Sequence, residues 1–245
     1  GGFENIIRAK SELFQHLIQT KGQVFINSQN PILSNMAKRF TNPLFYPGGG
    51  DYYHCELLNA DPFLKVRTES GEEITTQLIG DYNFENVASA LCIGKYFGVK
   101  AKEANTAISE YSPGNMRSQV VKKGSNTIIL DAYNANPSSM HAAIENLASM
   151  KAEKKVAIVG DMFELGDEAE AEHKAIGKLL ADKKFNAVYL CGKLMEAALT
   201  ELSTAHYFEK KEDLLKALQQ NPISTATVLI KASRGIGLES VVEGL

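Results

Sequence analysis

The sequence is poor in cysteine and carries no excess of positive charge. Three cysteines, Cys55, Cys92 and Cys191, are spread over 245 residues without a CxxC pair. So sparse and odd a set argues against a disulfide framework and against a zinc site, and a cytoplasmic location is expected. Lysine and arginine number 26 against 29 aspartate and glutamate residues, which gives no indication of a nucleic-acid partner.

Long apolar runs are absent as well. No run reaches the roughly 18 residues that a membrane helix needs, and no signal peptide opens the chain, so no membrane insertion is expected. The composition is 44% hydrophobic and 22% charged, which excludes a wholly disordered chain. Because the sequence opens on Gly1-Gly2-Phe3 rather than on methionine, we expect a fragment of a longer protein.

Several familiar nucleotide-binding and catalytic motifs are missing. The phosphate-binding pattern G-x-x-x-x-G-K-[ST] does not occur, so a phosphate cradle for ATP would have to lie outside these residues. The segment Gly235-Ile236-Gly237 lacks the third glycine of a dinucleotide-binding fingerprint. No Gly-x-Ser-x-Gly turn and no Ser/His/Asp arrangement is present, which argues against a serine hydrolase.

Residues 1–111 predict a mixture of helices and short strands. Apolar residues recur at helical spacing over residues 3–20. Further helices are expected at 31–40, 83–98 and 101–111, one strand at 24–27, and three strands within 51–80. Asn83 is the expected N-cap of the helix at 83–98. The expected buried face of this helix consists of Val87, Ala90, Leu91 and Phe97.

A regular alternation of strands and helices begins after a break at Ser112-Pro113-Gly114-Asn115. Strands are expected at 127–131, 155–160, 186–191, 204–208 and 226–231, and helices at 138–150, 168–182, 193–201, 211–220 and 238–243. The strands are near-continuous apolar runs, typical of a parallel sheet covered on both faces. The expected fold class is therefore α/β, with a partial first domain over residues 1–111 and a complete doubly wound domain over 112–245.

Polar side chains follow three of these expected strands. They lie in residues 131–137 (Asp-Ala-Tyr-Asn-Ala-Asn-Pro), 160–166 (Gly-Asp-Met-Phe-Glu-Leu-Gly) and 231–235 (Lys-Ala-Ser-Arg-Gly). In open α/β sheets, ligands bind outside the carboxyl ends of the strands. We therefore expect Asp131, Asp161 and Lys231 to meet at one edge of one sheet.

The chemistry of these side chains suits a polar ligand. Asp131 can accept hydrogen bonds from ribose hydroxyls, and the amides of Asn134 and Asn136 can read a polar ligand beside a helix N-terminus. Lys231 or Arg234 can neutralise a phosphate or a carboxylate. The same residues can equally form a helix start with proline at its first position, a solvated turn and a basic strand end. The pattern alone leaves both interpretations open.

Five further positions lie outside these segments. Arg117 follows the break in the chain, where it can serve a ligand or remain a surface charge. Asn83 and Asn86 are three residues apart, so their amides face one side of a helical turn and can read an adenine edge. Lys10 and His173 have no partner at ligand spacing. We expect both on the surfaces of helices.

Taken together, these motifs resemble the Mur ligases of peptidoglycan synthesis, and within that family the branch that adds D-alanyl-D-alanine. The segments that carry the resemblance are 8–14, 83–90, 115–117, 131–140, 160–166, His173 and 228–234. They run in family order across the whole chain. The resemblance implies that residues 1–111 are the C-terminal part of a central ATP-binding domain and that 112–245 are a C-terminal Rossmann-like domain. The UDP-binding domain and the P-loop would lie outside these residues.

The resemblance also implies a reaction: ATP-driven formation of an amide bond through an acyl phosphate, for cell wall biogenesis. The substrates would be a UDP-N-acetylmuramoyl-tripeptide and D-alanyl-D-alanine, with ATP and Mg²⁺, and the protein a monomer. Assigned by position, ATP would be bound by Asn83, Asn86, Arg117, Asp131 and Tyr133. The catalytic residues would be Lys10, which family members can carbamylate to hold Mg²⁺, with Arg117, Asn134 and Asn136. The dipeptide would contact Asn136, Lys231, Ser233 and Arg234.

Two other interpretations compete with this one. A related ligase of the folylpolyglutamate synthase type would share the fold, but residues Tyr133-Asn134-Ala135-Asn136 argue against it. A non-catalytic α/β module that binds a nucleotide or a partner would need no P-loop. For these residues on their own, we expect no turnover of ATP.

Overall fold

The computed structural model describes residues 3–245, which group into two compact units. The N-terminal unit comprises the residues up to Gln77 together with Asp81–Tyr111. The C-terminal unit comprises Ser112–Leu245 and also the short segment Leu78–Gly80. From the sequence, that segment was expected in the first domain, over residues 1–111.

The first part of the N-terminal unit is a pair of helices beside two short parallel strands. The elements are α1 (Phe3–Thr20), β1 (Phe25–Asn27), α2 (Pro31–Ala37) and β2 (Leu44–Tyr46). Helix α2 begins where it does because the Asn30 side chain accepts hydrogen bonds from the backbone of Ile32 and Leu33, and Pro31 occupies the first turn. Val24, Ile26 and Ala37 form the small buried core here.

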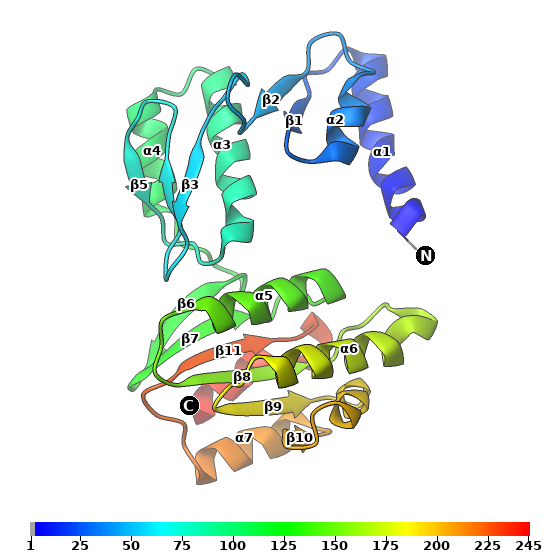
Figure 1. The fold of residues 1–245 in the computed structure, drawn as a ribbon, viewed down its shortest axis with the longest axis vertical. Coiled ribbons are helices and arrows are strands. Elements are labelled where there is room, and N and C mark those ends of the chain that lie inside the picture. Colours follow the sequence, from blue (N-terminus) through cyan, green and yellow to red (C-terminus); the bar gives the residue numbers. More distant parts are fainter. Residues whose placement is uncertain (1–2) are drawn as a thin grey trace. The chain divides into compact units, whose positions relative to one another are not determined.

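The second part of this unit is a three-stranded antiparallel sheet with two helices. Its elements are β3 (Glu56–Asn59), β4 (Lys65–Arg67), β5 (Glu73–Thr75), the short 3-10 helix η1 (Asp81–Asn83), α3 (Phe84–Tyr96) and α4 (Ala101–Glu110). Figure 1 shows α3 and α4 beside the strands of this sheet. The three expected strands within 51–80 are confirmed.

The expected buried face of α3 is partly wrong. Phe97 is 73% exposed, because α3 ends at Tyr96 and the chain turns away at Gly98, whose φ is +77°. The residues that α3 buries are Val87, Ala88, Leu91 and Cys92. At about 100° per residue these cover an arc of roughly 140° that leaves Ala90 outside it.

The C-terminal unit is built on a six-stranded sheet in the order β10-β9-β8-β11-β7-β6. The strands are β6 (Gln119–Lys123), β7 (Asn126–Asp131), β8 (Lys155–Gly160), β9 (Ala187–Cys191), β10 (His206–Phe208) and β11 (Thr227–Lys231). All pairings are parallel except that of β6 with β7. Sequence analysis missed β6, because this edge strand is only half-buried and ends in Lys122-Lys123 before a glycine turn.

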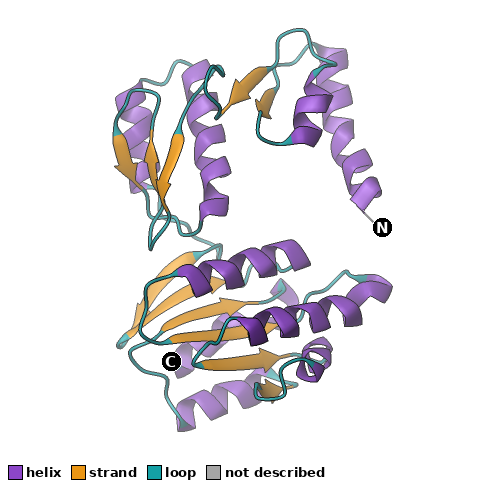
Figure 2. Cartoon of the chain, viewed as in Figure 1, coloured by secondary structure: helices purple, strands orange, loops and turns teal. Residues whose placement is uncertain are grey.

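Helices cover both faces of this sheet, as the apolar strands predicted. On one face lie α5 (Pro137–Ser149), α6 (Ala169–Asp182) and η3 (Leu194–Thr200), and on the other α7 (Lys211–Gln220) and η5 (Leu238–Gly244). Successive strand residues alternate between the two cores: Ile129 packs in the first, Ile128 and Leu130 in the second. Figures 1 and 2 show α5 and α6 lying across one face. The helices expected at 193–201 and 238–243 are present as η3 and η5, which are 3-10 helices.

The thiols and the helices give two further observations. All three cysteines are free and buried, and burial raises the pKa of Cys55 and Cys191 to about 12 and that of Cys92 to about 11. Across residues 3–245, every helix is too short or too polar to cross a bilayer.

Candidate functional site at the carboxyl edge of the sheet

Three strands of the C-terminal sheet end side by side in polar residues. In the register of the sheet, Lys231 on β11 is paired with Asp131 on β7 and with Val159 on β8. Gly160 ends β8, so Asp161 follows at the same edge. The expected meeting of Asp131, Asp161 and Lys231 at one edge is confirmed.

The buried Lys231 forms an ion pair with the partly buried Asp131. Lys231 is 1% exposed, and its Nζ lies 2.6 Å from Asp131 Oδ2 and 3.1 Å from the carbonyl oxygen of Asn134. The other carboxylate oxygen of Asp131 accepts a hydrogen bond of 3.1 Å from the backbone N–H of Ser118. Both charges are therefore matched by partners of this chain, as a buried ion pair requires.

Two arginines lie beside an exposed aromatic ring at this edge. The guanidinium carbon of Arg117 is 4.0 Å from the centroid of the Tyr133 ring, and that of Arg234 is 6.0 Å from it. These are cation–π distances. Tyr133 is 41% exposed and both arginines are exposed. Guanidinium groups that keep free donors can bind a phosphate or carboxylate, so this cluster is able to receive an anion.

The two asparagines of the first loop have different surroundings. Asn136 is the N-cap of α5, where its side-chain oxygen accepts the backbone N–H of Ser139 at 2.8 Å while the Ser139 hydroxyl accepts the N–H of Asn136. This reciprocal pair is a capping box. Asn134 is exposed, and its side-chain oxygen accepts the N–H of Ala135 at 2.9 Å. Of the two, Asn134 has the less committed side chain.

The side chain of Asp161 binds the backbone at the start of the 3-10 helix η3. It is 3% exposed, and its Oδ1 accepts the backbone N–H of Met195 at 2.8 Å, with Leu194 and Lys193 also contributing backbone hydrogen bonds. Burial raises the pKa of this carboxyl group, and the hydrogen bonds to Met195 and its neighbours oppose that rise. Asp161 thus shapes the loop by capping η3. Glu164, in the same loop, is exposed.

The expectation that His173 lies on a helix surface is wrong. His173 is completely buried, its Nε2 accepts the backbone N–H of Met162 at 3.0 Å, and its Nδ1 donates to the carbonyl of Ala169 at 2.6 Å. The neutral ring therefore holds the loop that contains Met162. A signal was available in the sequence: His173 stands three and seven residues before Ile176 and Leu180, on the apolar face of α6.

Ser233 ties two of the loops together. It is 4% exposed, its backbone N–H donates to the carbonyl of Asp161 at 2.9 Å, and its hydroxyl accepts the N–H of Phe163 at the same distance. The ring of Phe163 lies against Gly235, where any Cβ would come within 2.8 Å of it. Sequence reasoning missed Phe163, whose 39% exposed ring adds an apolar surface to this edge.

The remaining predicted residues belong to the N-terminal unit. The Asn86 amide donates to the side-chain oxygen of Asn83 at 3.0 Å, so the two amides do share one side of the turn. Asn83 occupies the N-cap position of α3, as expected, but its backbone is already helical and its side chain makes no cap hydrogen bond. Lys10 lies exposed on α1, as expected.

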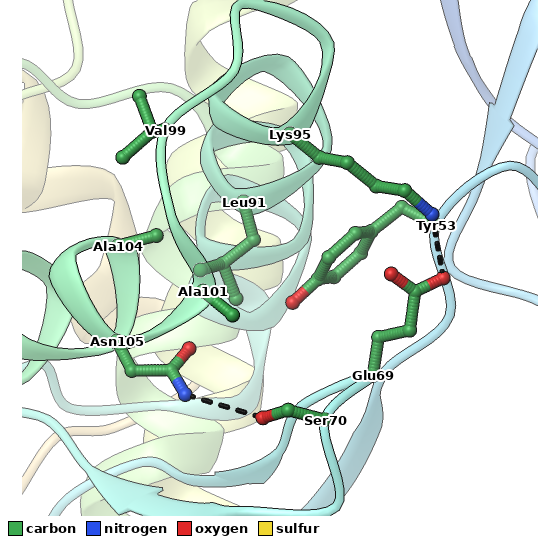
Figure 3. Close-up of a pocket in the computed structure, with 9 residues that line it drawn as sticks. All are labelled: Tyr53, Glu69, Ser70, Leu91, Lys95, Val99, Ala101, Ala104 and Asn105. Carbon is green, nitrogen blue, oxygen red and sulfur yellow. Dashed lines mark hydrogen bonds and ion pairs between the residues drawn. The ribbon is translucent and has the colours of Figure 1, made fainter.

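The N-terminal unit also contains a cavity of about 320 Å³ that sequence reasoning did not single out. Figure 3 shows its lining, in which Leu91 and two alanines form one wall and Tyr53 projects between Lys95 and Asn105. Lys95 Nζ lies 2.8 Å from a Glu69 carboxylate oxygen, and the Asn105 amide donates to the hydroxyl of Ser70. Because these polar groups satisfy one another, the cavity presents mainly apolar surface. None of the predicted site residues lines it.

The doubly wound sheet and the loops at its carboxyl edge correspond to a known family. Residues 116–234 match the family described as Mur ligase, glutamate ligase domain, and the chain belongs to the Mur ligases. Over its full length it is 33% identical to the UDP-N-acetylmuramoyl-tripeptide–D-alanyl-D-alanine ligase of Bacillus subtilis, covering 55% of that protein. The corresponding ligase of Haemophilus influenzae is 26% identical, with the same coverage.

Solved structures agree with this assignment. A crystal structure of MurF from Acinetobacter baumannii superposes with a TM-score of 0.82 at 26% identity, over 99% of this chain and 55% of that one. A MurF from Thermotoga maritima, at 22% identity and a TM-score of 0.73, shares the fold over 91% of this chain and 52% of its own. The chain thus spans about half the length of the curated relatives it matches.

Proposed function

We propose that these residues form part of an ATP-dependent ligase that joins D-alanyl-D-alanine to a UDP-N-acetylmuramoyl-tripeptide. The observation that carries the proposal is the 33% identity to the Bacillus subtilis ligase of that name along the entire chain. The Thermotoga maritima relative, described as a complex with ADP, supports nucleotide use by the shared fold. The polar loops at the carboxyl edge of the sheet supply side chains suited to such substrates.

The proposed reaction has two steps. A carboxylate oxygen of the tripeptide attacks the γ-phosphorus of ATP, which forms an acyl phosphate and releases ADP. The amine of D-alanyl-D-alanine then attacks the acyl carbon, loses a proton, and expels inorganic phosphate as the amide forms. Both steps require positive charge near the phosphates and exclusion of water.

The exposed side chains of the site are the ones available to substrates. Arg117 would bind the phosphates, Asp131 the ribose through its remaining lone pairs, and Tyr133 the nucleotide. Asn134 would face the reacting groups and Arg234 the dipeptide carboxylate. Asn136 and Ser233, whose polar atoms are engaged in the capping box and between the loops, would shape the acceptor side. Asn83 and Asn86 would bind adenine.

Magnesium would be held with the help of Lys10. Among residues 3–245, no three His, Cys, Asp or Glu side chains gather as a metal-binding group. Lys10 would supply one oxygen ligand after carbamylation, since this modification replaces the ammonium by a carboxylate-like group that suits a hard cation. Lys10→Ala should then lose ligation and regain part of it with added short carboxylic acids. Full loss without any rescue would contradict carbamylation.

The proposal is tested by assaying ligation with the protein that the natural reading frame containing these residues encodes. Phosphate release from ATP should require both the UDP-linked tripeptide and D-alanyl-D-alanine, and a ligated product should appear by mass spectrometry. Asp131→Ala should weaken the use of ATP, and Asn136→Ala should impair ligation. Phosphate release independent of D-alanyl-D-alanine would contradict the ligase, and nucleotide binding without any product would favour a non-catalytic module. Unchanged rates in both variants would contradict these site assignments.

A further inference from the structure

We propose that Lys231 is a positioning residue that fixes the loop after β7 and contacts no substrate itself. Its effect on ligation rests on the proposed function, whereas its effect on the loop can be measured without any substrate. The inference starts from burial. Lys231 ranks among the largest fully buried side chains of the described chain, and its side chain is 2% exposed.

The ammonium group holds both ends of a four-residue segment. Nζ donates to Asp131 Oδ2 at 2.6 Å, where the segment begins, and to the carbonyl of Asn134 at 3.1 Å, where it ends. Between these points the backbone N–H of Tyr133 donates to the carbonyl of Met116 at 3.3 Å. Lys231 therefore determines how the exposed Tyr133 and Asn134 are presented.

The same ion pair extends to the segment that carries Arg117. The second oxygen of Asp131 accepts the N–H of Ser118, the residue next to Arg117. Ser118 has a φ of +49° and both residues before Arg117 also have positive φ, a backbone that needs outside support. Lys231 holds the carboxyl group of Asp131 in the orientation that this bond needs. The stacking of Arg117 on Tyr133, at 4.0 Å, thus depends on the buried charge of Lys231.

The two basic residues of the segment 231–235, Lys231 and Arg234, therefore have different roles. Arg234 is exposed and lies beside the Tyr133 ring, so it can reach a ligand. Lys231, three residues earlier, is enclosed by the sheet and uses its donors on protein oxygens. A cation that touches substrate would need exposure that Lys231 lacks.

Hydrogen exchange on the chain alone tests the structural half. Lys231→Met keeps the length of the side chain and removes its charge, and Lys178→Met makes the same change at an exposed position of α6. In the Lys231 variant, the amides of Ser118 and Tyr133 should exchange about tenfold faster or more, beyond any change in the amides of β8. The Lys178 variant should exchange like the wild type. Equal protection of Ser118 and Tyr133 in both variants would overturn the proposal.

A double-mutant cycle tests the functional half. The cycle uses Asp131→Asn, Lys231→Met and the double variant, and the double variant leaves no buried charge without a counter-charge. Because Lys231 and Asp131 support the same segment, the loss of kcat/KM for ligation in the double variant should be smaller than the product of the two single losses. Losses that multiply fully would show that Lys231 acts on ligation independently of Asp131 and would overturn the proposal. A wild type without ligation would refute the proposed function, while the exchange experiment would still decide the role of Lys231.

Discussion

At the scale of single residues, the site is built from polar groups that the fold has enclosed. Asp161 shows what this enclosure does to a carboxylate. The backbone N–H groups at the start of η3 favour its charged form, but removal from water disfavours that form more strongly, and the pKa rises above its usual 3.8. The charge of Asp161 is therefore a cost to the folded state at neutral pH.

Asp161→Asn should reveal this cost as a pH dependence. Asparagine keeps an oxygen for the N–H of Met195 but does not titrate. A carboxyl group whose pKa is raised by folding adds stability that is fully present below its unfolded pKa and is lost as pH rises through the folded value. The wild type should therefore gain stability relative to the variant as pH falls from 7 to 4. Urea unfolding at several pH values measures the free energy of unfolding of both proteins. A wild type that gains no stability relative to the variant toward acid, or loses some, would contradict the raised pKa.

Residue identity could be predicted from the sequence better than residue environment. The position of Asp131, Asp161 and Lys231 at strand ends followed from the apolar runs before them, and the register confirms their common edge. The burial of Asp161 and Lys231 did not follow, because it depends on elements such as η3 that pack over the loops from distant parts of the chain. His173 illustrates the point: its spacing was visible, but its partner Met162 lies in a loop that no periodicity describes.

At the scale of secondary structure elements, α5 carries the loop that contains Asn134 and Asn136. The capping box ties the first turn of this helix at Asn136 and Ser139, and Pro137 fits the first position because it has no N–H to satisfy. The amide of Asn136 thus has a structural task at a position where the proposed function also needs it.

Two substitutions separate these tasks. Asn136→Ala removes the cap and should lower the free energy of unfolding by about 1 kcal/mol, within a range of 0.5–2. Asn136→Asp keeps the accepting oxygen and adds a charge that the helix N-terminus favours, so its stability should match the wild type. Chemical denaturation of the chain measures both. If the aspartate variant is stable but impaired in ligation, the amide serves a substrate; if it is fully active, the cap alone explains the residue.

The elements themselves were predicted unevenly, for physical reasons. Strands β7, β8 and β11 are buried on both faces and appear as unbroken apolar runs, so they were found within about one residue. Strand β6 lies at the edge of the sheet with lysines in half-exposed positions, and its sequence offers no such run. In the N-terminal unit, Asn83 has the residue type of an N-cap, but a preceding 3-10 turn places its backbone in a helical conformation.

At the scale of the whole molecule, the chain passes from one unit into the other more than once. Leu78–Gly80 groups with the C-terminal unit, and Ile79 is fully buried within its core. Three residues between two turns show no period, so sequence reasoning could not assign them. The C-terminal unit consequently draws on a residue more than thirty positions before its main segment begins at Ser112.

Ile79→Ala should therefore destabilise the C-terminal unit. Truncation of a fully buried isoleucine costs about 2–5 kcal/mol, because transfer energy is lost and a cavity remains. Ile6→Ala, at a position of α1 that is 53% exposed, provides the matched control and should cost less than about 0.5 kcal/mol. Hydrogen exchange of β8 and β11 amides, compared with amides of α3, measures where stability is lost. Loss confined to the N-terminal unit would contradict the assignment of Ile79.

Because the thiols are buried, the reactivity of each cysteine depends on local or global unfolding of its own unit. Cys191 ends β9 in one unit, while Cys55 and Cys92 lie in the other, and all three sulfur atoms are shielded and protonated at neutral pH. A thiol can then react with iodoacetamide only when its surroundings unfold locally or its whole unit unfolds. Following the alkylation of each cysteine by mass spectrometry would measure how fast each of the two units unfolds, in one sample and without an added label.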